Sequence, residues 1–309
     1  MAALQTLVPV FFMLGLGYLS RVKKWISPEQ KAGANTIVFT VLFPIMIFSL
    51  LGSAQLRLET AGIIVYVTVA FFLAMILGKI LGTFTGIKQA HFSPYLLTTV
   101  EGGAVALPLY LSIVGQSSNT VIFDLAGSII AFLVIPIMIA KTSEGQKSRS
   151  QLAKEVFFHP FVIAILLGLF FNLTGLQSWI LQSSFASLYT GIIDKATGPI
   201  LGMILFVLGY DFHLDFHTLK SMLRLMMVRL VYYIFVIAGF FLLFPSFMAD
   251  KFFLIAVLLY FMCPTGFAMP LLIQDSFKDE GDRTYVATFI SLYMAITILV
   301  YTVLVVIFV

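Results

Sequence analysis

Residues 105–109 read Val-Ala-Leu-Pro-Leu and residues 267–271 read Phe-Ala-Met-Pro-Leu, so one motif occurs twice in the chain. Each copy lies in an apolar run of about 20 residues, which is long enough to span a bilayer. A proline in a spanning helix removes a backbone hydrogen bond, and irregular backbone persists at that depth only beside protein or a water-filled cavity. Broken helices in corresponding places of two halves usually mark a substrate site. The pair therefore predicts a transporter built from two repeats.

Composition places the chain in the membrane, because 61% of its residues are hydrophobic and only 10% are charged. Such a balance is too apolar for the surface of a soluble protein. The first apolar run has no basic residue before it and no small-residue cleavage pattern, so we expect it to stay as a helix rather than to be removed as a signal peptide. We predict an all-α polytopic membrane protein with ten transmembrane helices, at residues 4–20, 33–52, 60–82, 93–114, 119–140, 157–176, 194–211, 224–245, 252–274 and 285–309.

The distribution of basic residues predicts the orientation. Of the 18 Lys and Arg residues, 15 are assigned to loops after odd-numbered helices, and Arg229 is one of these 15. The three exceptions are Arg57, Lys195 and Lys251. Short loops rich in Lys and Arg remain in the cytoplasm. We therefore expect a multi-pass protein of the cell membrane, with both termini outside and the loop between helices five and six in the cytoplasm.

That loop is also the predicted boundary between two halves. Residues 141–156 form a polar linker rich in Ser and Gln, which separates a first repeat at 1–140 from a second at 157–309. Because each repeat has an odd number of helices, the second must enter the membrane from the opposite side, which makes the repeat inverted. Prolines and glycines recur in matching order in the two halves, as Pro9 with Pro160, Gly17 with Gly168, Pro44 with Pro199 and Pro108 with Pro270.

The centre of helix four contains Glu101, followed by Gly102 and Gly103. An intramembrane carboxylate is a functional-site hypothesis, because burying it without a partner costs several kcal/mol. We find no Lys or Arg at a matching depth to pair with it. The two glycines allow the backbone to leave helical geometry and another group to approach closely, although small residues also serve in simple helix packing.

Helix nine carries the matching break at Cys263-Pro264-Thr265-Gly266, six residues before Pro270. If both helices unwind and cross there, four half-helix ends meet near the midplane of the membrane. The two N-terminal ends suit a substrate carboxylate. The two carbonyl ends, with Glu101 and the hydroxyls of Thr99 and Thr265, suit a proton or a small cation. Prolines that only kink a packed helix are the alternative.

Other polar residues are less informative. Asp124 and Ser128 lie one turn apart near the outer start of helix five, where they either extend the cation site or form a solvated edge. Cys263 is the single cysteine, and we interpret it mainly as a small packing residue. We predict no metal site, because the alternating Asp211, His213, Asp215 and His217 are more typical of a polar loop.

The chain resembles the auxin efflux carrier family through Leu42-Phe43-Pro44, Gly102-Gly103 with Leu107-Pro108-Leu109, and Cys263-Pro264 with Pro270. Bacterial members of that family include proteins described as malate or malonate permeases, and the fold is similar to that of bile acid:sodium symporters. The resemblance implies a panel of helices one, two, six and seven, a moving core of helices three to five and eight to ten, and a homodimer through the panel. One position departs from the family pattern, since Glu101 stands where an Asn is usual.

Together with the resemblance, these observations predict a secondary active transporter of a small organic anion, a carboxylate such as malate, malonate or an auxin-like acid, and the resemblance implies an elevator motion. We expect proton coupling, because a desolvated carboxyl can take up a proton on one side and release it on the other. The predicted substrate-binding residues are Gly102, Gly103, Pro108, Cys263, Pro264, Thr265, Gly266 and Pro270, and the predicted coupling residues are Glu101, Thr99, Asp124 and Ser128. The alternatives are a sodium-coupled symporter of the bile-acid type, a transporter-fold sensor and a membrane enzyme. We expect no cofactor and no nucleic-acid partner.

Overall fold

The computed structural model describes residues 2–54, 58–82, 90–115, 119–135, 157–158, 160–211, 216–266, 269–273, 276–278 and 280–309. All regular secondary structure in these ranges is helical. The first half contains α1 (Ala2–Val22), α2 (Pro28–Thr36), the π-helix η1 (Ile37–Leu42), α3 (Phe43–Gly52), α4 (Leu58–Leu81), the short 3₁₀ helix η2 (Ala90–Phe92), α5 (Ser93–Leu97), the π-helix η3 (Gly102–Ala106), α6 (Leu107–Val114), α7 (Asn119–Ile129) and the π-helix η4 (Ile130–Val134).

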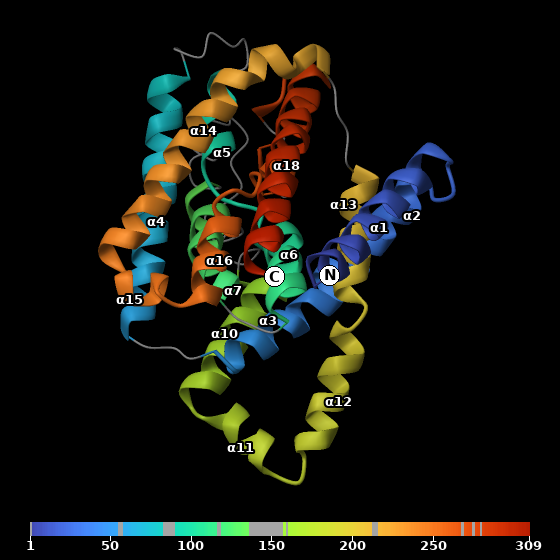
Figure 1. The fold of residues 1–309 in the computed structure, drawn as a ribbon, viewed down its shortest axis with the longest axis vertical. Coiled ribbons are helices and arrows are strands. Elements are labelled where there is room, and N and C mark those ends of the chain that lie inside the picture. The colour runs from blue at the N-terminus through green and yellow to red at the C-terminus, as the bar shows by residue number, and fades with distance from the viewer. Residues whose placement is uncertain are drawn as a thin grey trace.

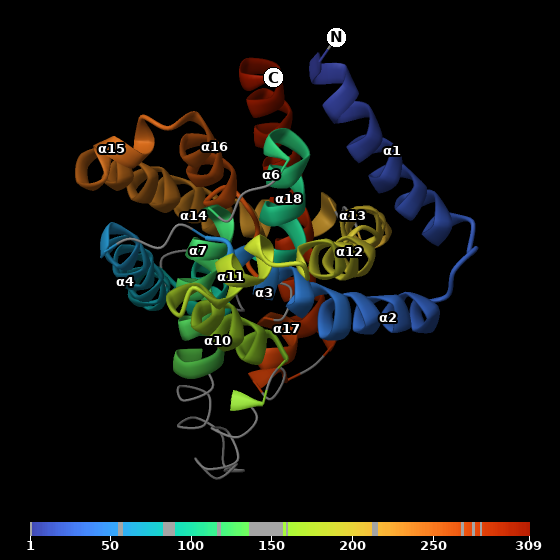
Figure 2. The same cartoon turned by 90° about the horizontal axis from the view of Figure 1, so that it is seen from below.

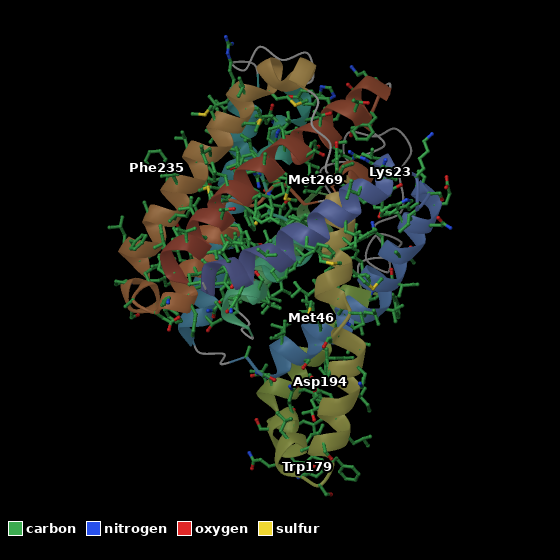
Figure 3. The ribbon with its side chains drawn as sticks, turned by 45° about the vertical axis from the view of Figure 1, so that its right-hand side comes forward. Lys23, Met46, Trp179, Asp194, Phe235 and Met269 are labelled. Atoms are coloured by element: carbon green, nitrogen blue, oxygen red, sulfur yellow. The ribbon has the colours of Figure 1, made fainter. Side chains whose placement is uncertain are left out.

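The second half contains α10 (Pro160–Leu173), α11 (Leu176–Gln182), α12 (Ala186–Thr197), α13 (Ile200–Asp211), α14 (Phe216–Leu243), α15 (Pro245–Met248), α16 (Lys251–Tyr260), α17 (Met269–Leu272) and α18 (Glu280–Phe308). In Figure 1, α14 crosses in front of α4, α18 runs through the middle, and α11 and α12 extend below the other helices. Trp179 lies at the lower tip of this extension in Figure 3.

Within the described ranges, seven helices are long and apolar enough to cross a membrane, where the sequence predicts ten. They are Ala3–Val22, Pro28–Gly52, Thr60–Leu81, Ser93–Val114, Ala186–Tyr210, Met222–Leu243 and Thr284–Phe308. A bent pair, Val162–Leu173 with Leu176–Gln182, makes up to eight if it is one span, and its two parts meet at 70°. The protein is thus a multi-pass, all-helical membrane protein in its described part.

The differences from the prediction have identifiable causes. The predicted fifth helix is described only up to residue 135. The predicted ninth is interrupted after Tyr260, which leaves α16 with 10 residues. The seventh span begins at Ala186 rather than at residue 194, because the amphipathic stretch before it forms α12 and continues the span.

Two prolines are accommodated by the π-helices that precede them. Proline cannot donate a backbone hydrogen bond, and its ring collides with the carbonyl four residues earlier in a regular α-helix. Before Pro44 the Phe43 amide donates to the Val38 carbonyl, five residues back, and before Pro108 the Leu107 amide donates to the Gly102 carbonyl in the same way. The wider turn relieves the collision, so both helices continue past the proline.

The helices associate in two sets (Figure 2). In the first set, α1 packs along α13 and α3 packs along α10, and in the second, α4, α5, α7, α14, α16 and α18 contact one another. Glycines permit the close approaches of the first set. The backbone of α13 lies directly against Gly17, the backbone of α1 lies against Gly209, and Gly168 lies against Phe48 and Leu51 of α3.

Aromatic rings fill the core of the second set. Phe123 of α7 has Phe240 of α14 at 5.7 Å and Phe253 and Tyr260 of α16 at 5.6 and 5.2 Å between ring centroids. Apolar side chains also cover the outside, for example Phe235 of α14, which is 70% exposed and points away from the other helices in Figure 3. An apolar exterior around an aromatic core is what a bilayer requires, because lipid is as apolar as the interior.

Substitution of Gly17 tests the contact between α1 and α13. A side chain at Gly17 would collide with the backbone at Phe206 and Tyr210, whereas Gly15 on the same helix has open space around it. We expect Gly17→Val to destabilise the fold by about 1–3 kcal/mol, the usual cost of overpacking, and Gly15→Val to have little effect. Thermal unfolding in detergent measures both, and equal melting temperatures for the two variants would contradict the packing shown here.

Candidate functional site

Two interrupted helices touch at their breaks. α5 ends at Leu97 and α16 ends at Tyr260, and the chain after each leaves helical geometry. The Glu101 amide donates to the Pro264 carbonyl at 2.8 Å, and the Thr265 hydroxyl donates to the Leu96 carbonyl at 2.5 Å. Hydrogen bonds between the breaks satisfy polar groups that a single unwound helix would leave unpaired.

A fully buried arginine from α14 binds the carbonyl ends of both broken helices. Nη1 of Arg229 donates to the carbonyls of Leu96, Leu97 and Thr98 at 2.8, 2.9 and 3.3 Å, and Nη2 donates to those of Thr99 and Cys263 at 2.9 and 3.1 Å. The rings of Tyr233 and Tyr293 flank the guanidinium at 4.7 and 5.0 Å. A permanent positive charge therefore occupies the place where the sequence predicts a proton or a small cation.

Arg229 corrects two sequence predictions. It is not a loop residue, because it lies within the Met222–Leu243 span and has no exposed surface. It also reaches the depth of Glu101, since it binds the carbonyl of Thr99 two residues away. Its position inside an apolar helix was the available signal, because an ionisable residue inside a spanning segment faces the protein interior and has a role there.

Glu101 caps the half-helix that follows it. Its Oε1 accepts a hydrogen bond from the Ala104 amide at 2.9 Å, at the start of the turn that leads through η3 into α6. Gly266 of the other break lies beside Glu101 Oε2 and Thr99 Oγ1. The N-terminal end of one half-helix, which the sequence predicts for a substrate carboxylate, thus already holds a carboxyl group of the protein.

Thr99 adopts an unusual backbone conformation at the break. Its φ is 46°, in the left-handed region that a β-branched residue rarely enters. The Arg229 contact to its carbonyl helps to hold this conformation. Its hydroxyl is buried and has no hydrogen-bond partner among the described residues. Strained residues with unpaired polar atoms concentrate at functional sites.

Asp124 is buried, and the solvated edge considered from the sequence is therefore wrong. Its Oδ1 accepts a hydrogen bond from the Tyr260 hydroxyl at 2.8 Å, while its Oδ2 has no hydrogen-bond partner in the described part of the chain. Gly102 packs directly on this carboxyl group. Asp124 thus lies against the residue that follows Glu101, and the side chain of Ser128 lies outside the described residues.

A cavity of about 800 Å³ lies between the two sets of helices. Its polar lining residues are Ser49, Ser53, Thr60, Asn119, Asp194, Thr197, Ser246 and Asp250. Pro108, which follows the η3 turn behind Glu101, is the one predicted substrate-binding residue among its lining residues. Asp194 and Asp250 were not identified from the sequence, because the sequence places Asp194 at the edge of the predicted seventh helix, although it lies within the span, and Asp250 lies just before α16.

The other predicted site residues have structural contacts. Cys263 is buried, its thiol donates to the Leu259 carbonyl at 3.3 Å, and its own carbonyl binds Arg229. Gly103 packs on the ring of Phe43, and Pro270 lies in α17. The described residues contain no group of three metal-ligating side chains, and residues 212–215, with His213 and Asp215, lie outside them.

Gly102→Ala tests the contact between the break and Asp124. A methyl group there would overlap the Asp124 carboxyl group, whereas at Gly127 on α7 it would make ordinary contacts, at 3.6 Å from the Tyr260 hydroxyl oxygen and 3.7 Å from Phe71. We expect Gly102→Ala to lower stability by about 1–3 kcal/mol and Gly127→Ala to behave like the wild type. Melting curves of the two purified variants decide the question, and an unchanged Gly102→Ala protein would show that the two groups are not packed together.

Comparison with known proteins agrees with this architecture. The family model described as membrane transport protein matches residues 2–274. A protein from Methanothermobacter thermautotrophicus, described as an uncharacterized transporter, is 26% identical over 248 residues, which cover 75% of this chain and 77% of the relative. The chain therefore belongs to the membrane transport protein family, the auxin efflux carrier family that its motifs resemble, and is a multi-pass membrane transporter rather than an enzyme.

Proposed function

We propose that the protein is a secondary active transporter that moves a small organic anion, such as malate or malonate, together with a proton. The observation that carries the proposal is the position of Glu101. Its carboxyl group caps the N-terminal end of a half-helix at the crossing of the two breaks, and its Oε1 accepts from the Ala104 amide. This amide is the group that would bind a substrate carboxylate, because helix N-termini favour anions.

Competition for that helix end provides the coupling. While Glu101 is ionised it occupies the Ala104 amide and repels a second carboxylate. A proton on Glu101 neutralises the side chain and weakens it as an acceptor, so a substrate carboxylate takes its place. One proton and one carboxylate then enter together. Thr99 Oγ1 and Asp124 Oδ2, which have no hydrogen-bond partner among the described residues, are further candidates for contacts with the bound species.

Alternating access follows from the two sets of helices. We propose that α1, α3, α10, α12 and α13 belong to a static panel and that α4 to α7 and α14 to α18 belong to a core that moves as an elevator. The cavity supports this division, because its lining includes Ser49 and Asp194 on the panel side and Pro108 and Asp250 on the core side. The homodimer through the panel stays a prediction.

The packing glycines support the inverted repeat. Gly17 of the first helix lies against α13, which belongs to the seventh predicted helix, and Gly168 of the sixth lies against α3, which belongs to the second. The paired contacts are those that exchange of the two halves would produce. We accordingly keep the proposal of five plus five helices, joined by the linker at 141–156.

Uptake of labelled malate into proteoliposomes tests the function. We expect an inward proton gradient to drive uptake without sodium, and Glu101→Gln to lose the gradient-driven component, because an amide cannot ionise. Glu29→Gln, at an exposed site in the first turn of α2, is the matched control. Gradient-driven uptake by Glu101→Gln would disprove the coupling role. No uptake by the wild type would exclude malate and lead to a screen of other organic anions.

Cysteine labelling tests the proposed orientation in the cell membrane. Cys263 is buried, so a membrane-impermeant maleimide should give little background with the wild type. We expect Gln182→Cys, at the end of α11, to be labelled in intact cells, and Ser143→Cys, in the linker, to be labelled only after permeabilisation. The reverse pattern would place both termini in the cytoplasm.

A further inference from the structure

We propose that Arg229 is a built-in cation that takes the place of an exchangeable coupling cation at the crossing, so that transport does not use sodium. The proposal deepens the transport function above and rests on it for its consequence in transport. Its structural content is independent of the substrate, because it concerns only what holds the two carbonyl ends together.

The backbone carbonyls at the crossing have the chemistry of a cation-binding site. Half-helix carbonyl ends and unwound backbone carbonyls are the groups that bind a coupling cation in transporters with broken helices. Five such carbonyls converge here, four from the stretch between Leu96 and Thr99 and one from Cys263, and all five accept from the terminal nitrogens of Arg229 at 2.8 to 3.3 Å. The ends of both broken helices are thus already neutralised.

In the described part of the chain, sodium has no open route to these carbonyl oxygens. Arg229 has no exposed surface, and Tyr233 and Tyr293 cover its guanidinium. The Tyr233 hydroxyl also donates to the Leu97 carbonyl at 3.0 Å. A sodium ion could reach these oxygens only by displacing a side chain that is anchored in the middle of α14 and makes five hydrogen bonds.

The positive charge on Arg229 is permanent. An arginine side chain stays protonated in proteins, whereas a bound sodium ion arrives and leaves in each cycle. The charge of Arg229 therefore remains with the core through the whole cycle. It keeps α14 attached to both breaks, but it cannot couple transport to a gradient. The coupling must come from a group that changes its charge, and Glu101 is a carboxyl group at the same crossing. Arg229 is thus a positioning residue.

Thermal unfolding of purified protein tests the internal cation without any substrate. We expect the melting temperature of the wild type to be the same in sodium and in choline chloride at equal ionic strength. Arg229→Ala should melt several degrees lower and should recover at least half of that loss in millimolar guanidinium or sodium, which fill the vacated place. The melting temperature of Arg229→Lys should lie between those of the wild type and Arg229→Ala, because lysine keeps the charge but lacks the planar guanidinium group. Arg224→Ala, at an exposed position of the same helix, is the matched control and should show neither effect.

Two results would overturn the proposal. One is a saturable, sodium-specific rise in the melting temperature of the wild type. This measurement does not depend on the folding of any variant. The other is an Arg229→Ala protein that folds and is stabilised by neither cation. In proteoliposomes, we expect uptake by the wild type to be unchanged by sodium and uptake by Arg229→Ala to become dependent on sodium or guanidinium. If the wild type transports no organic anion, the proposed function fails, while the melting curves still decide the role of Arg229.

Discussion

The Arg229 guanidinium binds carbonyls of both broken helices and joins the two breaks at the centre of the protein. An unwound segment in a membrane leaves backbone groups that water cannot reach, and each would cost several kcal/mol without a partner. A single planar cation with several donors satisfies five of them at once. Because Arg229 comes from a third helix, it also joins α14 to the crossing, and the three helices are held as one body.

The crossing thereby acquires an asymmetric charge distribution. The carbonyl ends hold a permanent cation, and the N-terminal end of the following half-helix holds the Glu101 carboxyl group. Asp124 lies against Gly102, and one of its oxygens accepts a hydrogen bond from the Tyr260 hydroxyl. In the proposed transport cycle, a substrate that approaches from the cavity at Pro108 would meet fixed charges that are already paired, and the adjustable charge would lie on carboxyl groups. This arrangement supports the proposed coupling through protons.

Long apolar segments were predictable, because a spanning helix needs about 20 apolar residues and the sequence shows that pattern directly. The breaks near Gly102 and Pro264 were predictable for a similar local reason, since glycine and proline favour a change of backbone geometry, although the structure places the first break before Gly102 and not at Pro108. Glu101 was identified because a carboxylate far from a membrane edge is conspicuous. Boundaries were less accurate, as the start of the seventh span at Ala186 shows, because an amphipathic helix that continues a span resembles a polar loop.

Residue type and spacing along the chain are enough to assign the membrane environment, the paired breaks and the intramembrane carboxyl group, because each is a local property. The groups that meet at the crossing depend instead on how distant helices pack. Arg229 is more than a hundred positions from Leu96, and no local pattern relates them. The same holds for Asp124 with Tyr260 and for the cavity between the helix sets. These contacts arise from the packing of helices that are distant in sequence. The same packing places Arg229, which the sequence analysis assigned to a loop, at the centre of the protein.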